Sequence, residues 1–180
     1  MAYEHNLPIF LHERLAFDDT LECIDEVTEK HKTKPNIIVH CYTGSYDECL
    51  VYSNRGYYFS ISGYICKPGE GSDEVKRCLR DGIIPLDKLM IETDSPYMGF
   101  AGNKDSFFDA EGESFTSLSS KKRKRLLKSL YPNVPSSLPL VLEAVCNEVN
   151  LGREERGETI LSVEELGHIT TNNAIGFFGL

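Results

Sequence analysis

The chain has 180 residues, of which 41% are hydrophobic and 26% are charged, and its formal net charge is −9. This composition excludes a disordered chain, which would hold fewer apolar residues, and a membrane protein, which needs apolar runs of about 20 residues. The first residues contain neither a basic segment nor an apolar run, so we expect no secretory signal. The six cysteines form no C-x-x-C pair, which favours reduced thiols in a cytoplasmic protein over a structural zinc site.

Four short apolar runs predict buried strands, and they lie at residues 7–11, 37–39, 57–61 and 89–91. The runs are rich in β-branched and aromatic residues and lack the apolar and polar alternation of a half-solvated sheet. Continuous apolarity is typical of a parallel sheet that is covered on both faces. We therefore expect an α/β fold with parallel strands.

Helices are predicted in each interval between these strands. The first spans residues 19–31, where Asp19 and Glu22 are spaced as a capping box and Leu21, Ile24 and Val27 share one face. The second begins after Ser45, which is followed by Glu48 at capping-box spacing, and the third is capped by Ser72 and ends near Gly82. This alternation predicts either a (β/α) barrel or an open doubly wound sheet.

The pattern changes after Pro96. Residues 99–137 predict a long loop, followed by helices over 138–145, from Ser162 onward and over 170–178. No composition shift marks a second domain, so residues 1–180 are interpreted as one domain. Within the loop, residues 121–128 hold six cations in eight positions. In an acidic chain, which repels nucleic acid on average, this run could be a solvated helix start, a nuclear-import signal or a phosphate-binding patch.

Ligand-type side chains close three of the four predicted strands. His12 follows the first strand, His40 follows the second, and Asp94 follows the fourth. Because functional groups collect at the carboxyl ends of parallel strands, these side chains are expected to converge. Imidazole and carboxylate groups can bind Mg²⁺, Mn²⁺ or Zn²⁺, which would activate a bound water. The alternative is that each histidine is a hydrogen-bonded structural residue and that Asp94 starts a turn.

Three further residues are weaker candidates. Glu92 lies two residues before Asp94, so it could orient a metal-binding imidazole, or it could form an ordinary buried ion pair. Arg14 could bind a substrate phosphate or simply lie on the surface. Thr43 precedes Gly44 and Ser45 at a helix start, where backbone N–H groups could bind an anion or could only be capped.

These motifs resemble the TatD family of metal-dependent deoxyribonucleases. The resemblance is carried most specifically by His40-Cys41-Tyr42-Thr43-Gly44-Ser45 and by Glu92-Thr93-Asp94-Ser95-Pro96-Tyr97, together with residues 8–14, 57–64, 84–91, 133–139 and 170–178. It implies a TIM barrel of the amidohydrolase-like type and exonucleolytic hydrolysis of phosphodiester bonds in a DNA substrate, with one or two divalent metal ions, Mg²⁺ or Mn²⁺ before Zn²⁺.

The resemblance also implies roles for individual residues. His12 and His40 would be metal ligands, and Asp94 would be a ligand or the general base that deprotonates the attacking water. Arg14 and Asn133 would hold the substrate. Independently of the resemblance, the cysteines favour a cytoplasmic protein, and the basic run at 121–128 leaves the nucleus as the alternative.

Two departures from the family pattern limit what the resemblance implies. The family's N-terminal H-x-H and G-E-x-G-L-D segments are absent, and the arginine that the family usually places close before its Asn-x-Pro segment is replaced here by Leu130-Tyr131-Pro132 before Asn133. The chain is therefore interpreted as the C-terminal half of the barrel, strands five to eight with the C-terminal helices. Half a barrel leaves two unpaired strand edges, so we expect self-association or another chain to complete it.

Three functions remain open at this point. The first is a nuclease of the TatD type whose N-terminal half is missing from this chain. The second is a non-catalytic interaction module derived from such a nuclease. The third is a different amidohydrolase-like activity on a lactone or cyclic amide, against which the two nuclease motifs argue.

Overall fold

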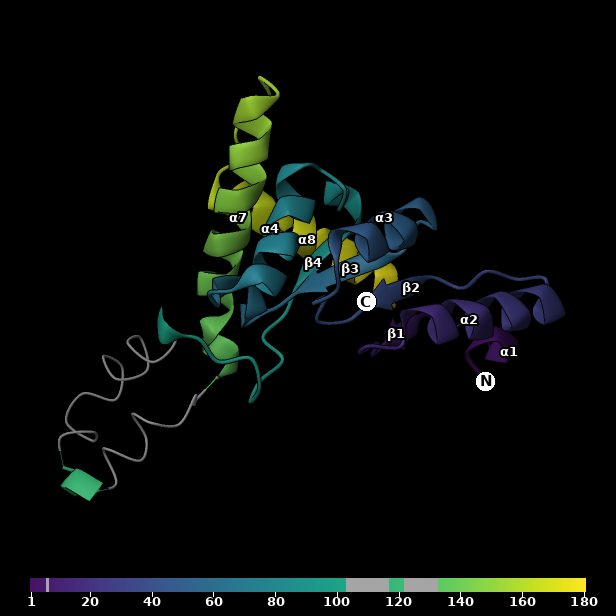
Figure 1. Cartoon of the computed structure of the whole chain (residues 1–180), viewed down its shortest axis with the longest axis horizontal. Helices are drawn as coiled ribbons and strands as arrows, with labels where there is room; N and C mark the ends of the chain where they lie inside the picture. Colours follow the sequence, from purple (N-terminus) through teal and green to yellow (C-terminus); the bar gives the residue numbers. More distant parts are fainter. Residues whose placement is uncertain (6, 103–116, 122–132) are drawn as a thin grey trace.

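The computed structural model describes residues 1–5, 7–102, 117–121 and 133–180, and within them it shows one parallel four-stranded sheet (Figure 1). The strands are β1 (Ile9–Leu11), β2 (Ile37–Val39), β3 (Tyr58–Ile61) and β4 (Leu89–Ile91), and they lie side by side in chain order. All four fall inside the predicted segments. β1 is shorter than predicted and starts after Pro8, which has no backbone N–H to contribute to a strand ladder.

Helical segments follow each strand, as the alternation predicts. Between the strands lie α2 (Phe17–His31), α3 (Tyr46–Asn54), the 3₁₀ turn η1 (Gly63–Cys66), α4 (Glu70–Arg80) and the 3₁₀ turn η2 (Leu86–Lys88). The chain opens with α1 (Ala2–His5), and η3 (Pro135–Ser137), α7 (Leu138–Glu155) and α8 (Val163–Phe178) follow the sheet. Four parallel strands with these crossovers are half the strand number of a (β/α)₈ barrel.

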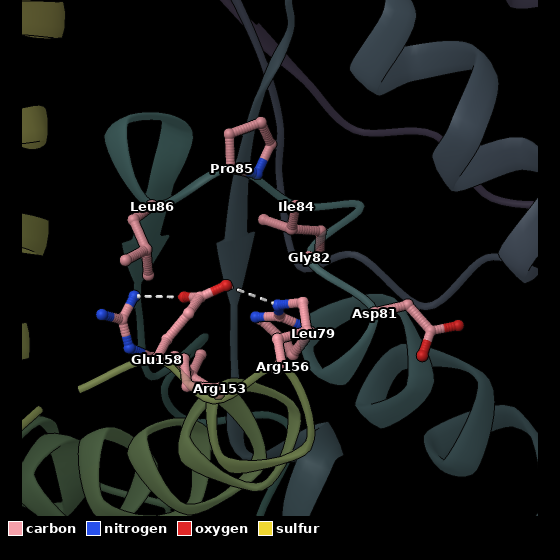
Figure 2. A pocket seen from close by; sticks show the side chains of 10 residues that line it. Leu79, Asp81, Gly82, Ile84, Pro85, Leu86, Arg153, Arg156 and Glu158 are labelled. Atoms are coloured by element: carbon pink, nitrogen blue, oxygen red, sulfur yellow. Dashed lines mark hydrogen bonds and ion pairs between the residues drawn. The ribbon is translucent and has the colours of Figure 1, made fainter. Parts of the chain in front are cut away.

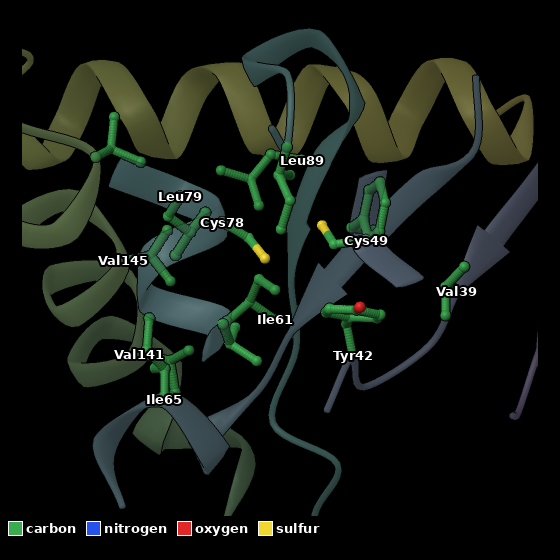
Figure 3. Close-up of a cluster of buried hydrophobic side chains, with 14 of the residues drawn as sticks. Val39, Tyr42, Cys49, Ile61, Ile65, Cys78, Leu79, Leu89, Val141 and Val145 are labelled. Atoms are coloured by element: carbon green, nitrogen blue, oxygen red, sulfur yellow. The ribbon is translucent and has the colours of Figure 1, made fainter. Parts of the chain in front are cut away.

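The two faces of the sheet bury different side chains, because successive residues of a strand point to opposite sides. On one face, Val39, Phe59, Ile61 and Leu89 pack with side chains from α3, α4 and α7 in the main core (Figure 3). On the other face, a smaller cluster joins Ile38 and Met90 to Phe177 of α8. Burial on both faces explains why the strands are continuously apolar rather than alternating.

Helix α8 ties the C-terminal segment to the amino end of β4. The side-chain amide of Asn173 donates hydrogen bonds to the main-chain carbonyls of Leu86 and Leu89, at 2.7 and 2.8 Å. Figure 1 shows α8 passing behind the sheet while α7 stands beside α4. The candidate residues that follow the strands lie at the other end of the sheet, because they come after the carboxyl ends of the strands.

Two predicted helix starts are correct, and two are wrong. Ser45 and Ser162 each form a capping box with the glutamate three residues later. Asp19, by contrast, lies inside α2, which begins at Phe17 because Phe17 packs edge-on against Tyr52 with ring centroids 5.1 Å apart. The expected capping box of Asp19 with Glu22 is absent, since no side chain caps α2.

The start of α4 also differs from the prediction. Ser72 is not its cap, because the helix begins at Glu70 after Gly69, whose φ of 128° suits glycine. The buried hydroxyl of Ser72 donates instead to the carbonyls of Lys67 and Gly69, at 2.6 and 3.0 Å. Ser72 therefore closes the turn from within the helix.

The apolar face and the last two predicted helices also differ in detail. Leu21 and Ile24 of α2 pack on the core, but Val27 is exposed. Residues 170–178 are not a separate helix, because they continue α8 without a break. Most of the predicted long loop and all of the basic run except Lys121 lie outside the described residues. No helix among those described has the length and apolar character needed to span a membrane.

Candidate active site

Histidine, carboxylate and hydroxyl groups meet where the parallel strands end. His12 directly follows β1, His40 directly follows β2, and Glu92 directly follows β4. A cavity of about 600 Å³ lies at this end of the sheet, and His12, His40 and Asp94 all line it. The prediction that these three side chains converge on one region is thus matched by their position in the fold. Whether they can bind one metal ion depends on the distances between their nitrogen and oxygen atoms.

The imidazole of His40 lies between two carboxylates. Its Nδ1 is 2.8 Å from Oε2 of Glu92, and its Nε2 is 3.6 Å from Oδ1 of Asp94. Because a carboxylate only accepts hydrogen bonds, Nδ1 carries the proton, and in the neutral imidazole Nε2 then keeps its lone pair. This is the arrangement in which a carboxylate orients a metal-binding histidine. The side chains of His40, Glu92 and Asp94 are only 12%, 17% and 23% exposed.

The spacing of His40 and Asp94 can be compared with metal–ligand bond lengths. A cation such as Zn²⁺ binds nitrogen and oxygen at about 2.1 Å each, so two ligand atoms can be up to about 4.2 Å apart. The observed 3.6 Å between Nε2 and Oδ1 satisfies this limit with a bent ligand–metal–ligand angle. The distance between these two atoms is therefore compatible with their binding one divalent cation.

The rest of a ligand set is less complete. The ring of His12 lies 5.5 Å from the ring of His40, centroid to centroid. Within the described part of the chain, no group of three or more His, Cys, Asp or Glu side chains is spaced to hold a metal ion. Glu92 also keeps one buried oxygen, Oε1, without a hydrogen-bond partner in that part of the chain. The site is thus a two-residue donor pair with a further histidine on the same cavity wall.

Two of the strand-end residues adopt left-handed backbone conformations that non-glycine residues rarely adopt. Cys41 has φ of 48° and Asp94 has φ of 54°. Such conformations cost of order 1 kcal/mol and persist where the surroundings hold them. The backbone N–H of Cys41 donates a hydrogen bond to Oγ of Ser60 at 3.1 Å, and this bond supports the left-handed conformation. The turn after β2 is therefore fastened to β3.

The thiol of Cys41 lies in a buried position beside the site. The residue is 8% exposed, and its Sγ lies 3.1 Å from Oγ of Ser62. Burial raises the pKa of this thiol to about 12, because a thiolate would lose its hydration there. Only the thiolate is nucleophilic, so burial disfavours the reactive form of Cys41 near pH 7.

Three backbone N–H groups at the start of α3 have side-chain partners within the chain. The backbone N–H of Ser45 donates to Oε2 of Glu48 at 2.7 Å, and that of Tyr46 donates to Oε2 of Glu74 at 3.0 Å. The N–H of Glu48 donates to Oγ of Ser45 at 3.3 Å. Ser45 thus forms a helix cap, one of the two alternatives that the sequence left open. Thr43, two residues before Ser45, lines the cavity.

The weaker candidates Arg14 and Asn133 differ in their position relative to the cavity. Arg14 lines the cavity with His12 and Asp94, while Asn133 is 2% exposed and bonds to the loop that carries Asp94. Five further residues that line the cavity had no role predicted from the sequence, namely Glu13, Cys41, Tyr64, Tyr97 and Met98. Tyr64 and Tyr97 belong to the motifs that carry the resemblance, but the spacing of those motifs does not indicate which residues face a cavity.

A second cavity, of about 350 Å³, lies among α4, η2 and the C-terminal end of α7 (Figure 2). Figure 2 shows Glu158 between the side chains of Arg153 and Arg156. Oε2 of Glu158 is 3.1 Å from Arg153, and Oε1 is 2.7 Å from Arg156. Both arginines thus have a carboxylate partner, and the main-chain carbonyl of Arg80 also accepts from Arg156. This cluster joins α7 to α4 and does not offer an unpaired cation to a ligand.

Comparison with known proteins identifies the family. The chain is similar to the 3′-5′ ssDNA/RNA exonuclease TatD of Escherichia fergusonii, with 36% identity over 98 residues, which are 54% of this chain and 35% of the relative. A TatD homologue from Escherichia coli K12 superposes with a TM-score of 0.65 at 19% identity, covering 99% of this chain and 52% of that structure. A TatD-family hydrolase from Entamoeba histolytica superposes with a TM-score of 0.62 at 20% identity, covering 97% and 51%.

The fold is thus that of a (β/α)-barrel protein of the TatD type, and the chain spans about half the length of the solved structures it matches. The profile of the TatD related DNase family matches residues 1–179. The chain belongs to this family.

Proposed function

We propose that this chain carries the C-terminal half of the active site of a divalent-metal-dependent nuclease that hydrolyses phosphodiester bonds in single-stranded DNA, one nucleotide at a time from an end. The observation that carries the proposal is the placement of His40 between Glu92 and Asp94 at the carboxyl end of the sheet. The name of the Escherichia fergusonii relative, a 3′-5′ ssDNA/RNA exonuclease, supports the substrate class.

In this proposal the residues of the chain have distinct tasks. Glu92 accepts a hydrogen bond from the Nδ1–H of His40 and so directs Nε2 toward Asp94. His40 and Asp94 hold Mg²⁺ or Mn²⁺, with Zn²⁺ as an alternative, and His12 completes the site from the wall of the same cavity. When bound, the cation lowers the pKa of water and neutralises charge on the phosphate.

Asp94 is also placed to accept a proton in this site. A general base must reach the proton it removes, and the carboxylate of Asp94 lines the cavity where a phosphate and water would lie. Arg14 and Thr43, on the same wall, are proposed to bind substrate oxygens, since arginine pairs with phosphate through two parallel N–H bonds. The basic run at 121–128 is proposed to attract DNA to this acidic chain.

The test is hydrolysis of a labelled single-stranded DNA by the purified chain with Mg²⁺ or Mn²⁺, with and without EDTA. Asp94→Ala and His40→Ala should each lower the rate at least about 100-fold, the lower range for losing a proton-transfer or metal-binding group. Asp18→Ala and His168→Ala are matched controls, because both residues are exposed, and neither lines the cavity. Metal-independent cleavage, or cleavage that survives Asp94→Ala, would contradict the proposal.

A non-catalytic interaction module is the alternative. It is favoured by one observation, namely that the described residues form a donor pair rather than a group of three ligands. A stably folded chain that binds single-stranded DNA but shows no metal-dependent cleavage would support this alternative. Loss of DNA binding on neutralising residues 121–128 would then locate the interaction.

A further inference from the structure

One buried side chain, Asn133, joins two segments that are far apart in the sequence. It is 2% exposed and lies just before η3. Its Nδ2 donates to the main-chain carbonyl of Thr93 at 2.6 Å and also to the carbonyl of Tyr97. Its Oδ1 accepts from the hydroxyl of Ser137 at 2.7 Å. Both the NH₂ and the oxygen of this amide thus have hydrogen-bond partners, and Thr93 and Tyr97 belong to the loop that carries Asp94.

The chemistry of the partners determines which way the amide must point. Carbonyl oxygens only accept hydrogen bonds, so the group facing Thr93 and Tyr97 has to be the NH₂. The Ser137 hydroxyl can donate to the remaining oxygen. An aspartate has the same shape but no donor, so at this position it would place a carboxylate oxygen against two carbonyl oxygens. Residue 133 must therefore be an amide for the loop to be held in this way.

The two carbonyls lie on either side of Asp94 in the chain. Asp94 has φ of 54°, a left-handed conformation that costs energy and needs support from its surroundings. A third bond reinforces the link, because Oγ of Ser95 donates to the main-chain carbonyl of Asn133 at 2.7 Å. Both ends of the short segment from Thr93 to Tyr97 are thereby fastened to one residue. Within this segment, Oδ1 of Asp94 lies 3.6 Å from Nε2 of His40.

We propose that Asn133 is a positioning residue, which holds the loop at residues 93–97 so that Asp94 faces His40, rather than a residue that binds substrate. This inference rests on the proposed role of Asp94 for its functional consequence. The local part, that the amide of Asn133 maintains the loop conformation, stands on the hydrogen bonds alone. It also explains how residues 133–139, far along the chain, belong to the same site as residues 92–97.

The experiment compares Asn133→Asp with Asn173→Asp in the full chain. Asn173 is a matched control, because its amide also donates to two main-chain carbonyls, those of Leu86 and Leu89, but at the other end of the sheet. Amide hydrogen exchange is measured across both variants. Asn133→Asp should speed exchange at residues 93–98 at least about tenfold and leave β2 and β3 unchanged, whereas Asn173→Asp should leave residues 93–98 unchanged.

A metal-binding readout and a kinetic readout follow on the same variants. Asn133→Asp should weaken Mn²⁺ binding, measured by calorimetry, and lower kcat about 100-fold with KM for single-stranded DNA changed less than about threefold. A substrate-binding role would instead raise KM. Wild-type exchange at residues 93–98 in Asn133→Asp, or a raised KM at unchanged kcat, would overturn the inference.

Two further results keep the outcomes separable. If Asp94→Ala cleaves DNA like the wild type, the proposed function is wrong, while the exchange data still decide whether Asn133 holds the loop. If Asn133→Asp does not fold by circular dichroism, Ser95→Ala serves in its place, because it removes one loop bond without adding charge. Ser95→Ala should then speed exchange at residues 93–98 about threefold or more, and unchanged exchange would overturn the inference.

Discussion

Single residues at the strand ends are oriented by their neighbours rather than by their own preferences. His40 is the best example, because a carboxylate contacts each of its ring nitrogens and Phe10 packs on its ring with centroids 4.6 Å apart. The positions of His12, His40 and Asp94 after strands could be predicted from the sequence. That His40, and not His12, pairs with both carboxylates could not be predicted, because this pairing depends on the register of β2 against β3 and of β3 against β4.

The thiols give a prediction at this scale. Cys23 is exposed on α2, whereas burial raises the pKa of Cys66 to about 11 and that of Cys41 to about 12. A raised pKa means that the thiolate forms only at higher pH, so at pH 8 about 0.1% or less of Cys66 and Cys41 is reactive. Iodoacetamide at pH 8 should therefore label Cys23 first, as measured by peptide mass spectrometry. Cys23→Ser should remove the fast phase, and rapid labelling of Cys41 would contradict the burial seen here.

Whole elements depend on close packing as much as on local sequence signals. The serine caps of α3 and α8 are local, because cap and glutamate are three residues apart, and both were predictable. The starts of α2 and α4 were not, since Phe17 packs on Tyr52 and Ser72 bonds to a carbonyl five residues earlier. Tertiary contacts and turn geometry outweigh capping propensity at those two positions.

The contact between α7 and α4 gives a prediction at the scale of elements. A Cβ added at Gly152 of α7 would lie 1.8 Å from the main-chain oxygen of Arg80 in α4. Gly152→Ala must therefore push the two helices apart, and we expect it to lower the free energy of unfolding by about 1–3 kcal/mol. Urea denaturation followed by circular dichroism measures the change.

Gly176 of α8 is the control for this substitution. It is also helical, but a Cβ there would meet nothing within 4 Å. Gly176→Ala should raise the free energy of unfolding by about 0.5–1 kcal/mol, because alanine has the higher helix propensity. Equal effects of the two substitutions would show that α7 and α4 do not approach as closely as described.

At the scale of the whole molecule, the four described strands form an open sheet. Among the described residues, β1 pairs with β2 on one side and β4 pairs with β3 on one side, so each has a free edge. Phe10 of β1 is 52% exposed, and Leu7 just before the strand is 56% exposed. Open edges and exposed apolar side chains favour association, so the self-association expected from the sequence stays a prediction with a physical basis.

Sedimentation of the purified chain tests this prediction. We expect a concentration-dependent dimer, in which the β1 edge of one copy meets the β4 edge of the other, and we expect Phe10→Asp to shift it to monomer. Leu15→Asp is the control, because Leu15 is fully exposed and lies after the strand. A monomer at all concentrations, or equal effects of the two substitutions, would contradict the proposed contact.

The sequence by itself determined the parallel α/β class, the approximate strands, two helix caps and the residues that follow each strand. These features are local, because periodicity and motif spacing act over a few residues. Only the tertiary structure decided which carboxylate contacts which nitrogen of His40, and that Asn133 bonds to Thr93 across 40 residues of chain. Such contacts depend on strand register and loop closure, which bring together residues whose distance in sequence carries no signal of their distance in space.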